Sequence, residues 1–191
     1  MQIGRSDDAV PTLETARMVM RGHRLSDFDA SAGMWADLAV VRRITGRPST
    51  RPEAWSRLLR HIGHWKALGF GYWVVEDRQT GDFLGEVGFA DYKRDIQPPM
   101  EGIPEIGWVL AVSAHGRGLA TEAVAAAVRW GDENLDAEKT ACIMAPDHAA
   151  SVRVAGKSGY REAGLATYMG EPTLIMERPR YGPDQPGNFP T

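Results

Sequence analysis

Hydrophobic residues follow two spacings along this chain, which predict helices and strands in turn. Apolar residues three or four positions apart follow Trp55 and again Leu119, and the first of these helices is expected to end near Gly69. Runs rich in β-branched and aromatic residues predict strands over 71–76 and 83–92, joined by a short polar turn. This hairpin favours an antiparallel sheet and argues against a doubly wound fold.

The same patterns predict the other elements of an α/β (α+β) fold in a single domain. Further strands are expected near 16–21, 106–112, 139–145 and 174–177, and further helices over 28–38, with Ser26 or Asp27 as cap, and 148–158. The Pro-rich segment 95–104 is expected to be a loop. The chain therefore divides into an N-terminal extension (1–12), one domain (13–178) and an irregular Pro/Gly-rich tail (179–191).

Composition is that of a compact enzyme and excludes several other classes. The 191 residues are 43% hydrophobic and 25% charged, with a formal net charge of −3, so a nucleic-acid partner has no electrostatic support. No apolar run has the length of a membrane span, and the N-terminus lacks a signal-peptide pattern, which predicts a cytoplasmic protein with no membrane partner. The single cysteine, Cys142, excludes an intrachain disulfide. A homodimer is left open.

The most informative segment is Trp108–Trp130, where an apolar strand meets a Gly-x-Gly turn that opens directly into an amphipathic helix. Gly116 and Gly118 let backbone N–H groups turn outward, and the first turn of the helix adds unpaired donors and the positive end of its dipole. Such a turn is a cradle for a pyrophosphate.

Two common nucleotide motifs do not match this turn. A Walker A loop ends in Gly-Lys-Ser/Thr, but the segment Trp108–Trp130 contains no lysine. A dinucleotide fingerprint has a third glycine where Thr121 stands, so an NAD-type oxidoreductase is supported only by Gly116 and Gly118, and the predicted hairpin opposes it.

The segment 115–120 (HGRGLA) instead resembles the acyl-CoA signature Gln/Arg-x-x-Gly-x-Gly/Ala of the GNAT superfamily of N-acetyltransferases, with His115 departing from its first residue. Residues 147–160 resemble the pattern Asn-x-x-Ser-(apolar)-Arg-x-x-x-Lys-x-Gly-Phe/Tyr of the ribosomal-protein N-terminal acetyltransferases, with His148 in place of Asn. The opening 13–21 looks like the first strand of that branch. The resemblance implies a mixed, mostly antiparallel central sheet flanked by helices, and transfer of an acetyl group from acetyl-CoA to an amine of a small molecule or a protein N-terminus.

The resemblance also implies where acetyl-CoA binds. Backbone groups of the strand end would bond the pantetheine arm as an added strand would, and the glycine turn would hold the pyrophosphate. The two histidines match cofactor-contacting positions of the family, and metal binding is not expected. The expected cofactor contacts are Leu110, Ala111, Val112, His115, Gly116, Arg117, Gly118, Leu119, Ala120, Thr121 and His148.

Catalysis needs a base for the amine and, in much of the family, a proton donor for the departing thiolate. Glu105, in a Glu-Ile-Gly-Trp stretch that resembles the family's strand, is the expected base that helps direct attack by the amine, with Glu86 as the alternative. Ala155 stands where the family commonly has a tyrosine, which brings Ser151 forward as the donor. Glu105 could instead cap a strand and Ser151 could bond to backbone.

The acceptor amine is not identified by the sequence. Its pocket is expected between the segments 35–55 and 91–105, whose charges are mixed. A non-catalytic acyl-CoA-binding module is the alternative function, because Ala155 and His148 both depart from the family's pattern.

Overall fold

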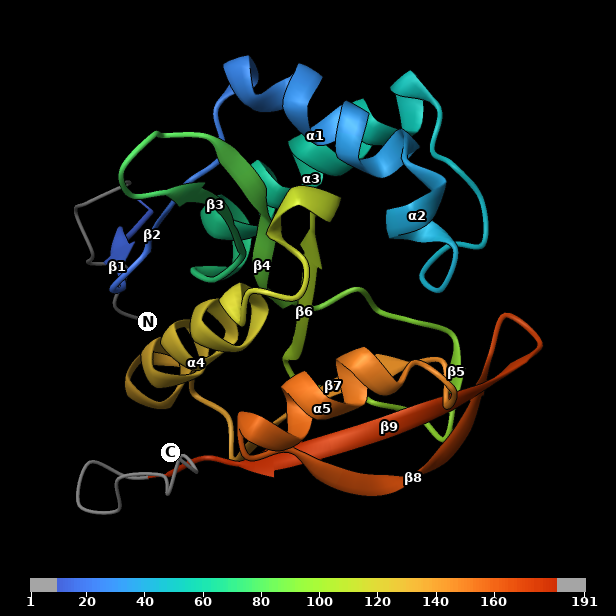
Figure 1. The fold of residues 1–191 in the computed structure, drawn as a ribbon. Helices are drawn as coiled ribbons and strands as arrows, with labels where there is room; N and C mark the ends of the chain where they lie inside the picture. The colour runs from blue at the N-terminus through green and yellow to red at the C-terminus, as the bar shows by residue number, and fades with distance from the viewer. Residues whose placement is uncertain (1–9, 182–191) are drawn as a thin grey trace.

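The computed structural model describes residues 10–181, and a nine-stranded sheet forms the centre of this part of the chain (Figure 1). The strand order is β1-β2-β3-β4-β6-β7-β9-β8-β5. The strands are β1 (Leu13–Glu14), β2 (Met18–Arg21), β3 (Tyr72–Asp77), β4 (Phe83–Ala90), β5 (Ile96–Gln97), β6 (Glu105–Leu110), β7 (Lys139–Met144), β8 (Arg161–Tyr168) and β9 (Glu171–Pro179). The helices are α1 (Phe28–Ala36), α2 (Leu38–Val41), α3 (Arg51–Leu68), α4 (Leu119–Asn134) and α5 (Ala149–Lys157).

Helices cover both faces of this sheet. Figure 1 shows α4 and α5 in front of the strands, with α1, α2 and α3 gathered near the top. The main core lies between the sheet and α4, where Val124 and Ala127 pack with strand residues such as Val87. On the other face, Trp35 of α1 and Val40 of α2 pack against Val109 of β6 in a second, smaller cluster. The predicted mixed, mostly antiparallel sheet flanked by helices is confirmed.

Strand register decides which side chains share a face. In the antiparallel ladder between β4 and β6, Glu86 lies opposite Val109 and Ala90 lies opposite Glu105. Residues directly opposite each other in such a ladder point to the same side of the sheet. Both acidic candidates, Glu86 and Glu105, therefore lie on the face covered by α1 and α2, away from α4.

The strands β6 and β7 form the one parallel pair within residues 10–181, and they separate after a single register pair. Glu105 lies opposite Ala141, and the ladder goes no further. By contrast, β4 pairs with β6 over six positions and β7 pairs with β9 over six. The edge of β6 beyond Glu105 therefore faces an opening in the middle of the sheet, at the same end as the glycine turn.

The long helix α3 ends at Gly69 as its sequence predicts, but it begins at Arg51, before the apolar spacing that starts at Trp55. Thr50 accepts a hydrogen bond from the backbone N–H of Glu53, whose side chain in turn accepts one from the Thr50 N–H, which forms a capping box. At the other end, Gly69 takes the left-handed conformation, with φ of 74°, that commonly ends a helix.

Three expectations about the elements need correction. The helix predicted over 28–38 stops at Ala36, because Asp37 turns extended and its side chain caps α2 by accepting a hydrogen bond from the Ala39 N–H. The segment 95–104 contains the short strand β5, which pairs with β8. Strand β8 was not predicted, because most of its residues are exposed and show no alternation; pairing with β9 orders it.

The predicted tail begins inside a strand, since β9 continues through Pro179 opposite Lys139. The rest of the tail beyond residue 181 and residues 1–9 of the predicted N-terminal extension lie outside the described residues. Among the helices of residues 10–181, none combines the length and the apolar character needed to cross a membrane.

Candidate functional site

The glycine turn opens onto free space at the start of α4. Gly116 and Gly118 have φ values of 72° and 76°, in the left-handed region that favours glycine. A Cβ built on Gly116 would meet nothing within 4 Å, and one on Gly118 would meet only the Arg17 guanidinium at 3.6 Å. The turn is therefore uncovered beside the unpaired N–H groups of the helix start, which are the kind of donors that bind a phosphate group.

Arg17, from the segment before β2, ties the glycine turn to the first turn of α4. Its Nη1 donates to the Arg117 carbonyl at 2.8 Å, and its Nε donates to Glu122 at 2.7 Å. Burial alone would raise the pKa of Glu122, but hydrogen bonds from Thr15 and Arg17 lower it below its ordinary value. The ionised Glu122 holds Arg17 beside the turn, where the guanidinium adds positive charge next to the cradle.

The strand end that was predicted to contact pantetheine is partly used by the protein itself. The Ala111 N–H donates to the Leu84 carbonyl at 2.9 Å, so this donor is not free for a ligand. His115 Nε2 lies 2.8 Å from the Leu110 carbonyl oxygen. This contact holds the imidazole against the strand end, next to Gly116, where the sequence places a cofactor contact.

The other side of the opening is formed by the turn between β7 and α5. His148 is the residue before α5, and burial, followed by the charge of Arg43, lowers its pKa below the ordinary value. Arg43, which follows α2, reaches this turn, donates to the Asp147 carbonyl at 3.2 Å and pairs with the Asp147 carboxylate. A neutral His148 therefore lies between the cationic Arg43 and the start of α5.

Ser151 lies in the first turn of α5 and is partly buried. Within residues 10–181 its hydroxyl has no hydrogen-bond partner, so the backbone bond considered from the sequence does not form. Ala155, one turn further on, is completely buried in the main core. The position where the resemblance to the family implies a tyrosine is therefore a buried alanine that carries no hydroxyl.

Glu105 borders a small pocket of about 90 Å³ at the point where β6 and β7 separate. The Arg94 guanidinium donates to both of its carboxylate oxygens, from Nε to Oε2 at 2.6 Å and from Nη2 to Oε1 at 2.8 Å. Arg94 also donates to the Tyr168 hydroxyl at 2.8 Å. The pocket is lined by Ala90, Asp91, Tyr92, Lys93, Arg94, Met100, Glu101, Ile103 and Glu105. The segment 91–105 therefore borders a cavity, but none of its lining residues comes from the other predicted border, 35–55.

Gly107 lies two residues after Glu105 on the same face of β6, and only a glycine fits there. A Cβ there would lie 2.0 Å from the Tyr72 hydroxyl. Burial raises the pKa of Tyr72 well above its ordinary value, and the neighbouring charge and hydrogen bond of Tyr92 add to this. The hydroxyl of Tyr72 is therefore neutral, and it lies next to Tyr92, which lines the pocket.

Glu86, the alternative base, is completely buried and does not border the pocket. Ser31 Oγ donates to one carboxylate oxygen at 2.7 Å, and Trp35 Nε1 donates to the other at 2.9 Å. Burial alone would raise the pKa of Glu86, but the imidazoles of His23 and His61 outweigh it and hold that pKa well below its ordinary value. The structure therefore separates the two candidate carboxylates, with Glu105 at the pocket and Glu86 in the interior.

Sequence reasoning missed three arginines of this region. Arg17 and Arg43 act across 105 and 104 positions of the chain on Glu122 and Asp147, and Arg94 binds Glu105 across a loop. A lone arginine in a loop carries no local pattern that reveals its partner. The one available signal was position, since Arg94 lies in the segment expected to border the acceptor pocket.

The chain matches the family described as "Acetyltransferase (GNAT) domain" over residues 17–161. It is 33% identical over 116 residues to the uncharacterized protein YkkB of Bacillus subtilis (strain 168), a match that covers 61% of this chain and 65% of that protein. The structure is similar to that of the "Putative GnaT-family acetyltransferase from Bordetella pertussis", with a TM-score of 0.77 and 28% identity over 88% of this chain and 99% of that one.

A further similar structure is RimL, the ribosomal L7/L12 α-N-protein acetyltransferase, in complex with coenzyme A. Its TM-score is 0.72, with 14% identity over 88% of this chain and 98% of that chain, so this likeness concerns the fold alone. The family match covers most of the chain and includes the glycine turn, β6 and α5. This chain therefore belongs to the GNAT acetyltransferase family.

Proposed function

We propose that this protein is an acetyl-CoA-dependent N-acetyltransferase that acts on an amine of a small molecule or of a protein N-terminus. One observation carries the proposal. Glu105 is both the last point of pairing between β6 and β7 and a wall of the pocket. An extended arm that enters between the separated strands from the glycine turn would therefore end beside a carboxylate and a cavity.

Acetyl-CoA would be the acetyl donor, and this chain offers groups for two parts of it. The pyrophosphate would take the N–H groups of residues 116–121, with Arg17 beside them. The pantetheine arm carries amides along an extended chain, and it would bond to the free edge of β6 up to Leu110 and Val112. His115 and His148 would flank the opening from its two sides. A cytoplasmic location, where acetyl-CoA is available, follows from the same proposal.

In the reaction, the acceptor nitrogen attacks the thioester carbonyl carbon, the carbon–sulfur bond breaks, and the sulfur leaves as a thiolate. The nitrogen must lose a proton, for which Glu105 is the proposed base. Although Arg94 occupies both oxygens of Glu105, each carboxylate oxygen has a second lone pair for an incoming amine proton. The free hydroxyl of Ser151 is the proposed donor of a hydrogen bond to the departing sulfur, and the thiolate takes its proton from water.

The pKa of the acceptor amine decides how strong a base Glu105 must be. An α-amine has a pKa of about 7.7–8.0, whereas a lysine-type amine has one of about 10.4. A carboxylate already bonded to a guanidinium suits the first class better, because less of that amine is protonated at neutral pH. An α-amine of an amino acid or a peptide is therefore the acceptor class we propose to test first.

The test is a thiol-release assay with acetyl-CoA and a panel of free amines, N-terminal peptides and amino-sugar antibiotics. We expect at least one α-amine acceptor to release coenzyme A at a rate that saturates with acceptor concentration. A thermal shift with acetyl-CoA, and none comparable with NAD or ATP, serves as the binding control.

A non-catalytic acyl-CoA-binding module is the second candidate function. Two observations favour this second function. Arg94 already donates to the Glu105 carboxylate, and the buried Ala155 offers no hydroxyl, so fewer groups are available for proton transfer. A thermal shift with acetyl-CoA without turnover of any acceptor in the panel would select this function over the transferase.

A further inference from the structure

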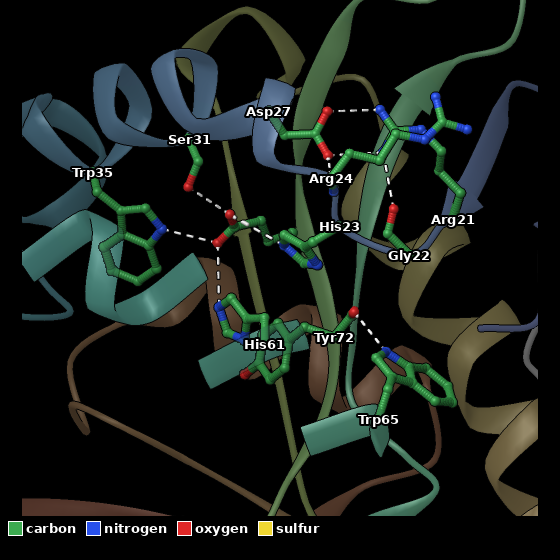
Figure 2. Close-up of polar contacts among 11 residues, drawn as sticks. Arg21, Gly22, His23, Arg24, Asp27, Ser31, Trp35, His61, Trp65 and Tyr72 are labelled. Atoms are coloured by element: carbon green, nitrogen blue, oxygen red, sulfur yellow. Dashed lines mark hydrogen bonds and ion pairs between the residues drawn. The ribbon is translucent and has the colours of Figure 1, made fainter. Parts of the chain in front are cut away.

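A cluster of two histidines and a glutamate lies on the α1 face of the sheet, apart from the pocket at Glu105. His23 follows β2, His61 lies on α3 and Glu86 lies on β4. Figure 2 shows the rings of His23 and His61 turned toward the same carboxylate. His23 Nε2 is 3.4 Å from Oε1 of Glu86, and His61 Nε2 is 3.6 Å from Oε2. The exposed fractions of the three side chains are 0%, 2% and 0%.

The imidazole nitrogens of this cluster have no hydrogen-bond partner. Nδ1 of both His23 and His61 is buried without a hydrogen-bond partner within the described part of the chain, and each Nε2 faces a Glu86 oxygen at ion-pair distance. The separations from Glu86 are too long, or too poorly directed, for hydrogen bonds. A buried polar atom without a hydrogen bond costs about 1–3 kcal/mol, so these nitrogens indicate that the cluster can hold a further group.

The carboxylate is oriented for such a guest. Ser31 and Trp35 each donate one hydrogen bond to it, at 2.7 and 2.9 Å, from the α1 side. These bonds hold the Glu86 carboxylate in place and leave its other lone pairs directed at the two imidazoles. Outer hydrogen bonds of this kind are what orient a metal-binding carboxylate.

We propose that His23, His61 and Glu86 bind a Zn²⁺ ion. Ligands about 2.0–2.1 Å from a tetrahedral zinc lie roughly 3.3 Å from one another, close to the two separations of 3.4 and 3.6 Å. One ligand atom from each of the three residues lies within 4.8 Å of the other two, so rotations of the rings would bring them onto one ion, with water as the fourth ligand.

The chemistry of the three groups selects the metal. Two imidazoles and one carboxylate suit zinc, whereas magnesium and calcium prefer oxygen ligands alone. Each imidazole, in its neutral form, offers a nitrogen lone pair to a metal ion. The sequence predicted no metal in this chain, and the present proposal departs from that prediction, because the sequence does not show that His23, His61 and Glu86 meet.

The ion would have a structural role. It would join the end of β2, the middle of α3 and the centre of β4, which are far apart in the sequence and together support the face that carries Glu105. A metal that binds only the folded chain stabilises it in proportion to its concentration. The proposal is independent of acetyl transfer and can be tested without any acceptor.

The first test uses the full chain, unfolded in the presence of a chelator and refolded with Zn²⁺, with Mg²⁺ or without metal. After desalting, we expect about one equivalent of Zn²⁺ per chain by elemental analysis. At 100-fold excess over the dissociation constant, the Tm should rise by roughly 5–10 °C with Zn²⁺ and not with Mg²⁺. Refolded protein that retains no zinc and shows no Tm response would overturn the proposal.

Variants locate the ion. His23→Gln and His61→Gln should each lose zinc uptake, whereas His64→Gln, on the same helix but outside the cluster, should keep it as the matched control. Since either glutamine variant could fail to fold, the absorption spectrum of Co²⁺ bound to His61→Cys provides a second measurement. The new thiolate should retain the metal and add a sulfur charge-transfer band to the cobalt spectrum. Zinc uptake unchanged in both Gln variants, or no new band in the folded Cys variant, would place the metal elsewhere.

Discussion

The Arg94 guanidinium donates one hydrogen bond to each carboxylate oxygen of Glu105, at 2.6 and 2.8 Å. The pair lies at the wall of the pocket, where β6 separates from β7. Arg94 therefore sets the direction of the carboxylate, and any proton that Glu105 accepts must arrive on a lone pair that the guanidinium does not use. Several of the predictions below depend on this relationship.

Replacing Glu105 by glutamine removes the proposed base and keeps the size of the side chain. At neutral pH we expect kcat/KM to fall by about 10²- to 10⁴-fold, with partial recovery in alkaline buffer, because the amine then loses its proton without help. Binding of acetyl-CoA should survive. The measurement is kcat/KM across pH with one identified acceptor, and an equal loss at every pH would show that Glu105 positions the acceptor without taking its proton.

Replacing Ser151 by alanine should have a smaller effect than replacing Glu105. The thiol of coenzyme A is already fairly acidic, with a pKa in the range of a free cysteine, about 8.5, so its thiolate leaves without strong assistance. We expect a drop in kcat of roughly tenfold or less and an unchanged thermal shift with coenzyme A. A loss as large as that of Glu105→Gln would instead make Ser151 essential to the chemistry.

Replacing Arg94 by glutamine leaves the buried Glu105 carboxylate without its cation. Glu105 is 10% exposed and Arg94 is 23% exposed, so we expect unfolding to become easier by about 1–3 kcal/mol. Arg94→Lys keeps the charge but loses the two-pronged geometry, and it should restore only part of the stability. Urea unfolding of the three proteins measures the difference. Equal stability of all three would mean that water replaces the guanidinium without cost.

Replacing Gly118 by valine should abolish the thermal shift caused by acetyl-CoA. The residue has a φ of 76°, which a β-branched side chain adopts only with strain, and its Cβ would point into the space left for the phosphate. Gly63→Ala is the matched control, because a Cβ there meets nothing within 4 Å and the position is helical. That control should melt slightly higher and keep the shift. If Gly118→Val still responds to acetyl-CoA as the parent does, the cradle lies elsewhere.

The capping box of α3 makes one acid-sensitive contact. Hydrogen bonds from Arg47 and from the Thr50 N–H lower the pKa of Glu53 to about 2. Because this pKa lies below the ordinary value, the contact stabilises the folded state above about pH 4.5 and is lost as the pH falls toward 2. An NMR titration of the Glu53 carboxyl carbon should show a midpoint near 2. Glu53 is exposed, so the effect on overall stability should be small, and Glu53→Gln should remove its pH dependence.

Local chemistry let the sequence predict many of the elements and part of the site. The helix ending at Gly69, the hairpin of β3 and β4 and the glycine turn before α4 were all predicted, because each depends on the spacing and conformational preferences of neighbouring residues. The family motifs covered the same stretches. By contrast, β8 was missed, because its order comes from pairing with β9 rather than from a pattern of its own.

The sequence alone determined that this is a one-domain α/β chain, and it predicted a phosphate cradle at residues 116–121 and candidate carboxylates at positions 86 and 105. Only the tertiary structure decided which carboxylate borders the pocket, that Arg94 binds it, and that His23 and His61 meet at Glu86. A turn or a helix cap depends on bonds between neighbours in the chain, so its residues reveal it. An ion pair or a metal cluster depends on strand register and helix packing, which bring together residues far apart in the sequence.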